Sequence, residues 1–123
     1  CGPCRRELPG LARMAASLAS ESRFQLVAVC TSGSVGETPA DLAAEAKEFL
    51  LRDRIAISAY VFTDPLTADL LSTTLGVRAI PATYLIGPDA TVRRVWIGYR
   101  PQDEADMAAA IVALLKESPA QPE

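Results

Sequence analysis

The sequence contains no histidine and only three cysteines, so it offers few ligands for a transition metal. A structural zinc site needs about four such ligands, and the composition therefore argues against one. The basic residues are scattered, and the net charge is −3 with a pI near 5.0. This charge favours neither nucleic acid nor an anionic membrane surface as a partner. The apolar run from Ala108 to Leu115 is far shorter than the ~20 residues that span a bilayer.

The chain is long enough to bury a core of its own. Its 123 residues are 50% hydrophobic and 22% charged, which is ordinary for a soluble globular protein. No internal repeat or low-complexity segment divides it. We expect one domain over residues 1–117, followed by a flexible C-terminal tail over residues 118–123.

Two thiols stand three positions apart at Cys1 and Cys4, directly before helix-forming sequence. Unpaired backbone N–H groups and the positive dipole end of a helix favour a thiolate at its N-terminus. Such placement can lower a thiol pKa from ~8.5 to roughly 3.5–7.5, and Cys4, one turn later, can then resolve a mixed disulfide. Gly2 permits unusual backbone angles and Pro3 fixes φ, so the pair tightens the turn. The pattern is typical of a reversible dithiol/disulfide site.

A bare C-x-x-C pair has other interpretations. It occurs as half of a four-ligand zinc site and as a static disulfide. Cys1 also fits the lipid-bearing first residue of a mature lipoprotein, in which case the spacing to Cys4 is a coincidence. Any signal peptide or anchor would lie upstream of residue 1.

Apolar periodicity and turn residues predict alternating helices and strands. A helix over residues 5–20 contains Pro9, which should bend it. Thr38, Pro39 and Asp41 form a helix start with a cap, a first-position proline and an acid at the third position. The remaining predicted elements are strands at 24–30, 59–63, 82–86 and 91–97, and helices at 39–54, 65–75 and 101–117. This order indicates an α/β layering in which helices cover a sheet.

Several side chains are predicted to be buried. The strand at 24–30 is apolar at nearly every position, which suits burial on both faces. Cys30, at the end of that strand, is more easily interpreted as a core cysteine than as a third redox partner. Leu66, Leu70 and Leu71 form the expected inner side of their helix, and Gly76 is placed to end it in the left-handed conformation. The strands at 82–86 and 91–97 should form an antiparallel hairpin around Gly87-Pro88-Asp89-Ala90.

The motif Cys1-Gly2-Pro3-Cys4, with Glu7 and Pro9 behind it and Val77-Arg78-Ala79-Ile80-Pro81-Ala82-Thr83 before the hairpin, resembles the thioredoxin superfamily. It is most similar to the extracytoplasmic thiol-disulfide reductases of the TlpA/ResA type, where the first motif continues C-x-x-C-x-x-E-x-P. The resemblance covers essentially the whole chain. It implies a thioredoxin-like α/β fold with a central mixed β-sheet flanked by helices.

The resemblance also implies roles for individual residues. Cys1 is the attacking thiol, Cys4 the resolving thiol, and Pro81 a cis-proline that faces the disulfide. Substrate contacts are implied for Gly2, Pro3 and Ile80, because in relatives the backbone beside the residue before this proline pairs with substrate as an added strand. Glu7 resembles an acid that tunes the two thiols. From the residues alone, Glu7 is equally an exposed helix acid that complements the helix dipole.

The sequence departs from this family in one respect. Relatives carry an apolar strand immediately before the first cysteine, and in their fold it lies between the counterparts of the strands at 24–30 and 82–86. Without it, both neighbours would expose a row of unpaired backbone groups. We therefore expect the natural protein to carry an apolar strand upstream of Cys1.

The implied function is a thiol-disulfide oxidoreductase that reduces protein disulfides outside the cytoplasm, in the bacterial periplasm or anchored facing it. It requires no metal or other cofactor, only an electron donor of a membrane or thioredoxin-type reductase system. No nucleic acid partner is expected, and membrane association only through an anchor upstream of residue 1. The alternative is a module that delivers a soft ion such as Cu(I), for which two thiolates suffice. Relatives that deliver copper usually add a histidine or methionine ligand. Here histidine is absent, and Met14 and Met107 are far from the motif in sequence.

Overall fold

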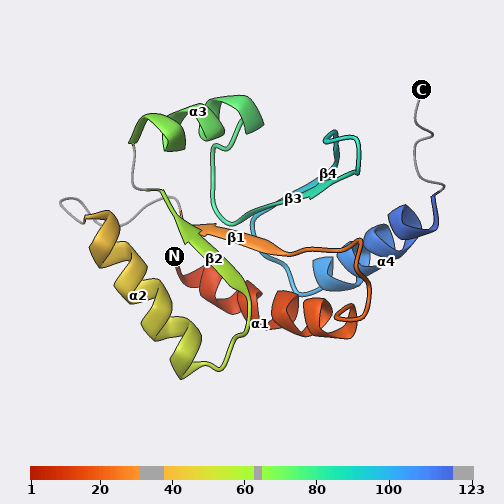
Figure 1. Ribbon diagram of the computed structural model, residues 1–123, viewed down its shortest axis with the longest axis horizontal. Coiled ribbons are helices and arrows are strands. Elements are labelled where there is room, and N and C mark those ends of the chain that lie inside the picture. The colour runs from red at the N-terminus through yellow and green to blue at the C-terminus, as the bar shows by residue number, and fades with distance from the viewer. Residues whose placement is uncertain (31–37, 63–64, 118–123) are drawn as a thin grey trace. The chain divides into compact units, whose positions relative to one another are not determined.

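The structure of the protein, a computed structural model, describes residues 1–30, 38–62 and 65–117. The tail predicted at 118–123 lies outside these residues, as do residues 31–37 and 63–64. The helices and strands alternate as expected (Figure 1). In chain order they are α1 (Gly2–Ser17), β1 (Val27–Cys30), α2 (Pro39–Arg52), β2 (Ser58–Val61), α3 (Pro65–Leu75), β3 (Ala82–Ile86), β4 (Val92–Ile97) and α4 (Asp103–Lys116).

The chain forms two compact units. The first combines Cys1–Met14 with Ala79–Glu123, and the second is Ala15–Arg78. Both cysteines of the motif and the Ile80–Pro81 pair lie in the first unit. The candidate site can therefore be described within a single unit.

The first unit is built on the predicted antiparallel hairpin of β3 and β4. Thr83 is the register partner of Trp96, and Tyr84 is the partner of Val95. Because side chains alternate along a strand, Thr83 and Trp96 share one face and Tyr84 and Val95 share the other. Ala90 closes the turn with a positive φ of 67°.

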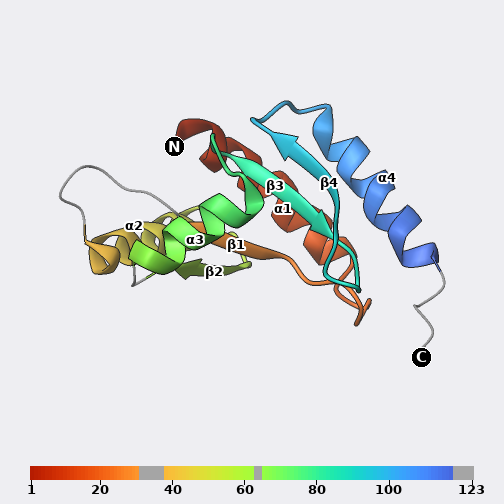
Figure 2. The ribbon, with the colours of Figure 1, turned by 90° about the horizontal axis from the view of Figure 1, so that it is seen from above.

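Two helices pack on the face of the hairpin that carries Thr83 and Trp96. A hydrogen bond from Thr83 to Glu7 ties α1 to β3, and one from Trp96 to Asp106 ties α4 to β4. Figure 1 shows both helices on the same side of β3 and β4, and Figure 2 shows α1 crossing beneath β3. The apolar core of this unit consists of Leu11, Trp96, Met107 and Ile111.

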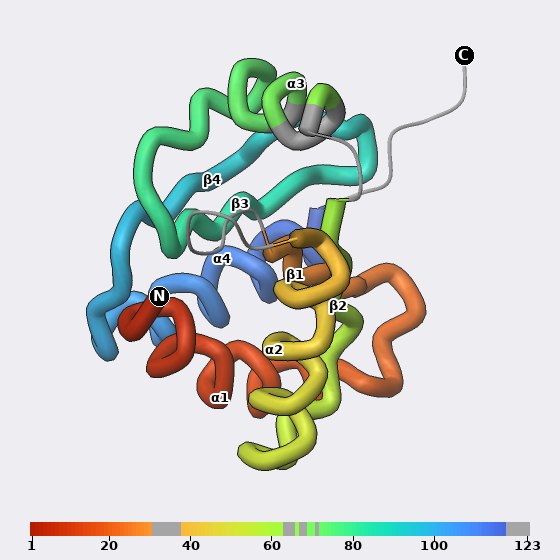
Figure 3. Tube along the Cα trace, turned by 90° about the vertical axis from the view of Figure 1, so that its left-hand side faces the viewer, coloured from red at the N-terminus to blue at the C-terminus, as the bar shows by residue number. Residues whose placement is uncertain are grey.

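In the second unit, β1 and β2 pair in parallel and α2 packs against both (Figure 3). Phe49 and Ile55 are its buried apolar side chains among the described residues. The predicted helix start is confirmed, with Thr38 as N-cap and Pro39 at the first position. Gly76 ends α3 with a positive φ of 69°, also as predicted.

The bounds of α1 differ from the prediction at both ends. The helix begins at Gly2, inside the motif, and not at residue 5. Pro3 is tolerated there because the first turn of a helix leaves its N–H groups unpaired anyway. The helix ends at Ser17 because the amides of Leu18 and Ala19 turn to the closer carbonyls three residues back.

Two predictions of burial were wrong. On α3, Leu66 and Leu70 are 75% and 65% exposed, and the side chain of Leu71 lies outside the description. On β1, Val27 and Val29 are 46% and 40% exposed. Periodicity shows which side chains share a face, but burial depends on whether another element covers that face.

The strands form two sheets and not the single central sheet of the prediction. Within the described residues, β1 pairs only with β2 and β3 pairs only with β4. Each of β1 and β3 thus has one edge without a strand partner there.

Replacing Thr38 with alanine should lower the free energy of unfolding by about 1 kcal/mol, because the helix loses its side-chain cap. In the structure Thr38 Oγ1 accepts from the Asp41 amide at 3.1 Å, and Asp41 Oδ2 accepts from the Thr38 amide at 3.1 Å. Urea unfolding measures the change. Thr74→Ala, at an exposed position in α3, is the matched control and should stay within about 0.5 kcal/mol of the parent. Equal losses in the two variants would contradict a capping role.

Candidate functional site

The two cysteines of the motif form a disulfide, with their Cα atoms 5.3 Å apart. Cys1 is exposed and Cys4 is half-buried. The Cys4 amide donates to Cys1 Sγ at 3.2 Å, and the Arg5 amide donates to the Cys1 carbonyl at 3.2 Å. Cys1 therefore stands at the cap position of α1, where free amides favour negative charge.

Gly2 and Pro3 are exposed in the first turn of α1. A Cβ atom at Gly2 would lie 3.3 Å from Nη1 of Arg6, so the missing side chain leaves room for that guanidinium. Cys1, Gly2 and Pro3 are thus three consecutive exposed residues, and none of them belongs to the buried core.

The peptide bond between Ile80 and Pro81 is cis, the geometry that the resemblance implied. The Pro81 carbonyl accepts from the Gly98 amide at 2.8 Å, which fixes the start of β3 against the end of β4. Ile80 is 42% exposed. The beginning of α1 lies beside the beginning of β3 in all three views (Figures 1, 2 and 3). Contact of Ile80 or Pro81 with a substrate stays a prediction.

Glu7 is buried, with only 4% of its surface exposed. Its Oε1 accepts a hydrogen bond from Thr83 Oγ1 at 2.8 Å. Its Oε2 is also buried and has no hydrogen-bond partner in the described part of the chain. The interpretation of Glu7 as an exposed helix acid was therefore wrong. The carboxyl lies one helical turn after Cys4, on the buried side of α1.

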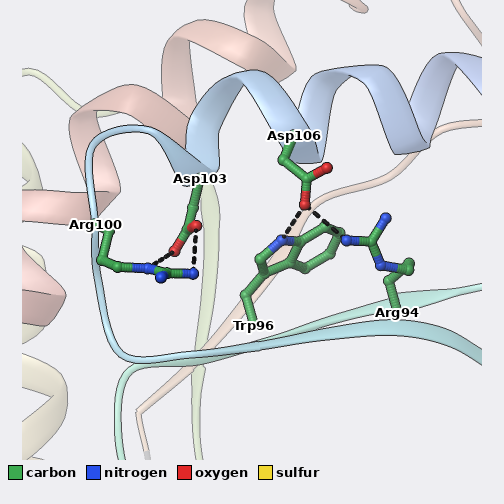
Figure 4. Close-up of polar contacts among 5 residues, drawn as sticks. All are labelled: Arg94, Trp96, Arg100, Asp103 and Asp106. Atoms are coloured by element: carbon green, nitrogen blue, oxygen red, sulfur yellow. Dashed lines mark hydrogen bonds and ion pairs between the residues drawn. The ribbon is translucent and has the colours of Figure 1, made fainter.

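Burial raises the pKa of the Glu7 carboxyl above its ordinary value, and the Thr83 hydrogen bond opposes that rise. The carboxylates of Asp103 and Glu104 raise it further. Both belong to the first turn of α4, and each faces an arginine. Asp103 accepts from Arg100 at 3.0 and 3.3 Å (Figure 4), and Glu104 pairs with Arg13 at 4.0 Å. No such cation pairs with Glu7 among the described residues.

A second acid of α4 fastens that helix to the hairpin. Asp106 Oδ2 accepts from Trp96 Nε1 at 2.9 Å and from Arg94 at 2.7 Å, as Figure 4 shows. The Arg94 guanidinium also lies over the Trp96 ring, 4.8 Å from its centroid. These contacts hold the acids of the first turn of α4 in place beside α1.

Sequence reasoning missed Thr83, Asp103 and Glu104 as members of the site. Thr83 lies inside the second motif, so it was visible, but its hydrogen bond spans 76 positions. Asp103 and Glu104 follow the ordinary preference of helix N-termini for acidic residues and carried no separate signal. Cys30 is a free, half-buried cysteine in the second unit, and burial raises its pKa.

No protein-family model matches the chain, and no curated protein sequence matches it. Solved structures do. One is a protein of Chlorobium tepidum described as a thiol:disulfide interchange protein DsbE, with 28% identity and a TM-score of 0.72 over 94% of this chain and 72% of that one. Another is StoA from Bacillus subtilis, with 16% identity and a TM-score of 0.62 over 89% of this chain and 74% of that one.

The fold is therefore thioredoxin-like, and the chain is similar in structure to thiol:disulfide interchange proteins of the TlpA/ResA type. This agrees with the family suggested by the two motifs. Within the described residues, no helix combines the length and the apolar character needed to cross a membrane.

Proposed function

We propose that this thioredoxin-like chain, similar in structure to thiol:disulfide interchange proteins, is a thiol-disulfide oxidoreductase that reduces disulfides in protein substrates. The observation that supports it most directly is the Cys1–Cys4 disulfide at the start of α1, with Cys1 exposed and Cys4 half-buried. This asymmetry suits one thiol that attacks from the surface and one that attacks from within. An extracytoplasmic location follows from the resemblance and belongs to the same proposal.

The reaction proceeds in two exchanges. The Cys1 thiolate attacks one sulfur of the substrate disulfide, that S–S bond breaks, and the other substrate sulfur leaves as a thiolate. Cys4 then loses its proton and attacks Cys1 Sγ, which expels the second substrate sulfur and closes the Cys1–Cys4 disulfide. The substrate gains two electrons and the protein loses two. A dithiol donor protein must reduce Cys1–Cys4 before the next cycle.

The other residues of the site have supporting roles in this proposal. Gly2 and Pro3 have no bulky side chain that would block access to Cys1. The exposed Ile80 offers an apolar contact to an extended substrate segment. Pro81 sets the direction in which the chain enters β3. Glu7 exchanges protons with the thiol one turn before it, because burial raises the pKa of its carboxyl and a buried carboxyl with a raised pKa holds a proton to higher pH than an exposed one.

Reduction of insulin disulfides by the dithiol form, with dithiothreitol as donor, tests this function. We expect precipitation of the insulin B chain well above the dithiothreitol background. Added Cu(I) should inhibit by occupying the two thiolates. A protein that binds Cu(I) tightly but leaves insulin intact would contradict the proposal and favour the metal-delivery alternative.

Replacing Glu7 with glutamine should change how alkylation of the reduced protein depends on pH. Ionised Glu7 places a negative charge near the thiols and so disfavours the thiolate. In Glu7→Gln that charge is absent, so we expect the midpoint of iodoacetamide alkylation to move to lower pH. The pH profile of the alkylation rate should then fit the ionisation of a single group, the thiol. An unchanged profile would assign Glu7 a purely structural role.

The same variant should reveal the raised pKa of Glu7 in the stability of the oxidised protein. The folded protein binds the Glu7 proton more tightly than the unfolded chain, whose carboxyl has the ordinary pKa of 4.5. Stability from that proton is complete below pH 4.5 and is lost as the pH rises through the folded-state pKa. As the pH rises from 4.5 through the folded-state pKa of Glu7, the parent should therefore lose unfolding free energy relative to Glu7→Gln. Parallel curves of unfolding free energy against pH would contradict the raised pKa.

A further inference from the structure

The least expected feature of the site is the buried carboxyl of Glu7, because one of its oxygens accepts a hydrogen bond and the other does not. Glu7 Oε1 accepts from Thr83 Oγ1 at 2.8 Å, whereas Oε2 is buried without a hydrogen-bond partner in the described part of the chain. A buried polar atom left unpaired destabilises the fold. Such an atom is unusual in a folded protein and calls for a functional explanation.

We propose that the Thr83 hydroxyl is a positioning group for Glu7: it fixes Oε1 and so leaves Oε2 as the atom that takes up and releases the proton. This inference rests on the proposed function, in which Glu7 exchanges protons with a thiol. It adds Thr83, a residue of β3, to a site whose carboxyl and thiols lie in α1 and at the residue just before it.

Glu7 differs from the two neighbouring carboxyls in having no arginine partner among the described residues. Three carboxyls meet where α1 and α4 pack, and two of them face an arginine, Asp103 with Arg100 and Glu104 with Arg13. Glu7 has only the neutral Thr83 hydroxyl as its hydrogen-bond partner among the described residues. Glu7 therefore lacks the neighbouring positive charge that would favour its ionised form.

Gly10 gives the Glu104 carboxylate room beside α1. A Cβ atom at this position would collide with that carboxylate, so a larger residue would require the Glu104 side chain to move. Cys4 is the titratable group that shares α1 with Glu7 at one turn's distance. Among the described residues, the charged groups that act on Glu7 are Asp103 and Glu104, which pair with Arg100 and Arg13.

Threonine suits the positioning role better than serine. Its branched Cβ restricts χ1 strongly, and in β3 its side chain is directed to the same face as Trp96, where α1 and α4 pack. The hydroxyl is therefore held at one place over Oε1. Serine keeps the hydroxyl but loses part of this restriction, and valine keeps the shape but loses the hydroxyl.

The test compares Thr83→Val, Thr83→Ser and Thr91→Val in the reduced protein. Two readouts are followed against pH: the carboxyl ¹³C shift of Glu7, assigned with Glu7→Gln, and the rate of iodoacetamide alkylation. Thr91 is the matched control because its hydroxyl also donates to a carboxylate, Asp89 Oδ1 at 2.7 Å, in the exposed hairpin turn.

We expect Thr83→Val to move the Glu7 titration to higher pH, since the lost hydrogen bond had favoured the charged form. Because Glu7 then stays neutral to higher pH, the midpoint of alkylation should move to lower pH, the direction expected for Glu7→Gln. Thr83→Ser should restore most of the parent behaviour. Combining Glu7→Gln with Thr83→Val should give the alkylation profile of Glu7→Gln alone. Thr83 affects the thiols only through the Glu7 carboxyl, and that carboxyl is absent in the double variant.

An unmoved Glu7 titration in Thr83→Val, or an equal shift in Thr91→Val, overturns the inference. Thermal unfolding of each variant separates a loss of fold from a change in proton affinity, and Thr83→Ser remains informative if valine unfolds the protein. Neither readout needs a substrate. Failure to reduce insulin with the shift present would sink the proposed function alone, and insulin reduction without the shift would sink this inference alone.

Discussion

Replacing Cys1 with serine should abolish reduction of protein disulfides, and replacing Cys4 should trap the substrate as a covalent adduct. The exposed Cys1 is the thiol that a folded partner can reach. Its sulfur accepts a hydrogen bond from the Cys4 amide at the start of α1. In Cys4→Ser the first exchange still occurs, but no second thiol is present to release the substrate. In Cys1→Ser neither exchange has a reachable nucleophile.

Intact-mass analysis under non-reducing conditions measures both outcomes with one protein substrate. We expect a 1:1 adduct with Cys4→Ser that dithiothreitol releases, and none with Cys1→Ser. Turnover in both variants should fall to the background set by dithiothreitol. Cys30→Ser is the control because that free cysteine belongs to the second unit, and it should keep the parent activity. An adduct formed through Cys30, or activity in Cys1→Ser, would show that the nucleophile is assigned wrongly.

The parts of the site that could be predicted are those determined by local sequence. Cys1, Gly2, Pro3 and Cys4 are consecutive, so their position at a helix start follows from helix geometry and proline chemistry. The capping residues before α2 were predicted for the same reason, since Thr38 and Asp41 are three positions apart.

The parts that could not be predicted depend on which faces meet. Glu7 was ambiguous because a carboxylate on an early helical turn is equally common on the surface, and only contact with β3 and α4 buries it. Leu66 and Leu70 show the opposite error, an apolar stripe that remains 75% and 65% exposed. In both cases local sequence describes the side chain correctly and tertiary packing decides its environment.

The assignment of the core to one face of the hairpin leads to the largest expected change in stability. Trp96 is 6% exposed and is one of the few apolar side chains of the first unit that are buried. Its indole N–H donates to Asp106 at 2.9 Å, so the ring both fills the core and anchors α4 (Figure 4). Replacing it with alanine leaves a cavity and removes that anchor.

We expect Trp96→Ala to lower the free energy of unfolding by about 3–5 kcal/mol, a large part of the ~5–15 kcal/mol typical of a domain. Urea unfolding of the oxidised protein measures this loss, and Trp96→Phe separates ring packing from the hydrogen bond to Asp106. Val95→Ala is the matched control, because Val95 is adjacent in β4, points to the other face and is 43% exposed. Its loss should stay below about 1 kcal/mol. Equal losses for Trp96→Ala and Val95→Ala would mean that both faces of the hairpin are buried in the folded protein, and the assignment of the core to the face shared with Thr83 would then be wrong.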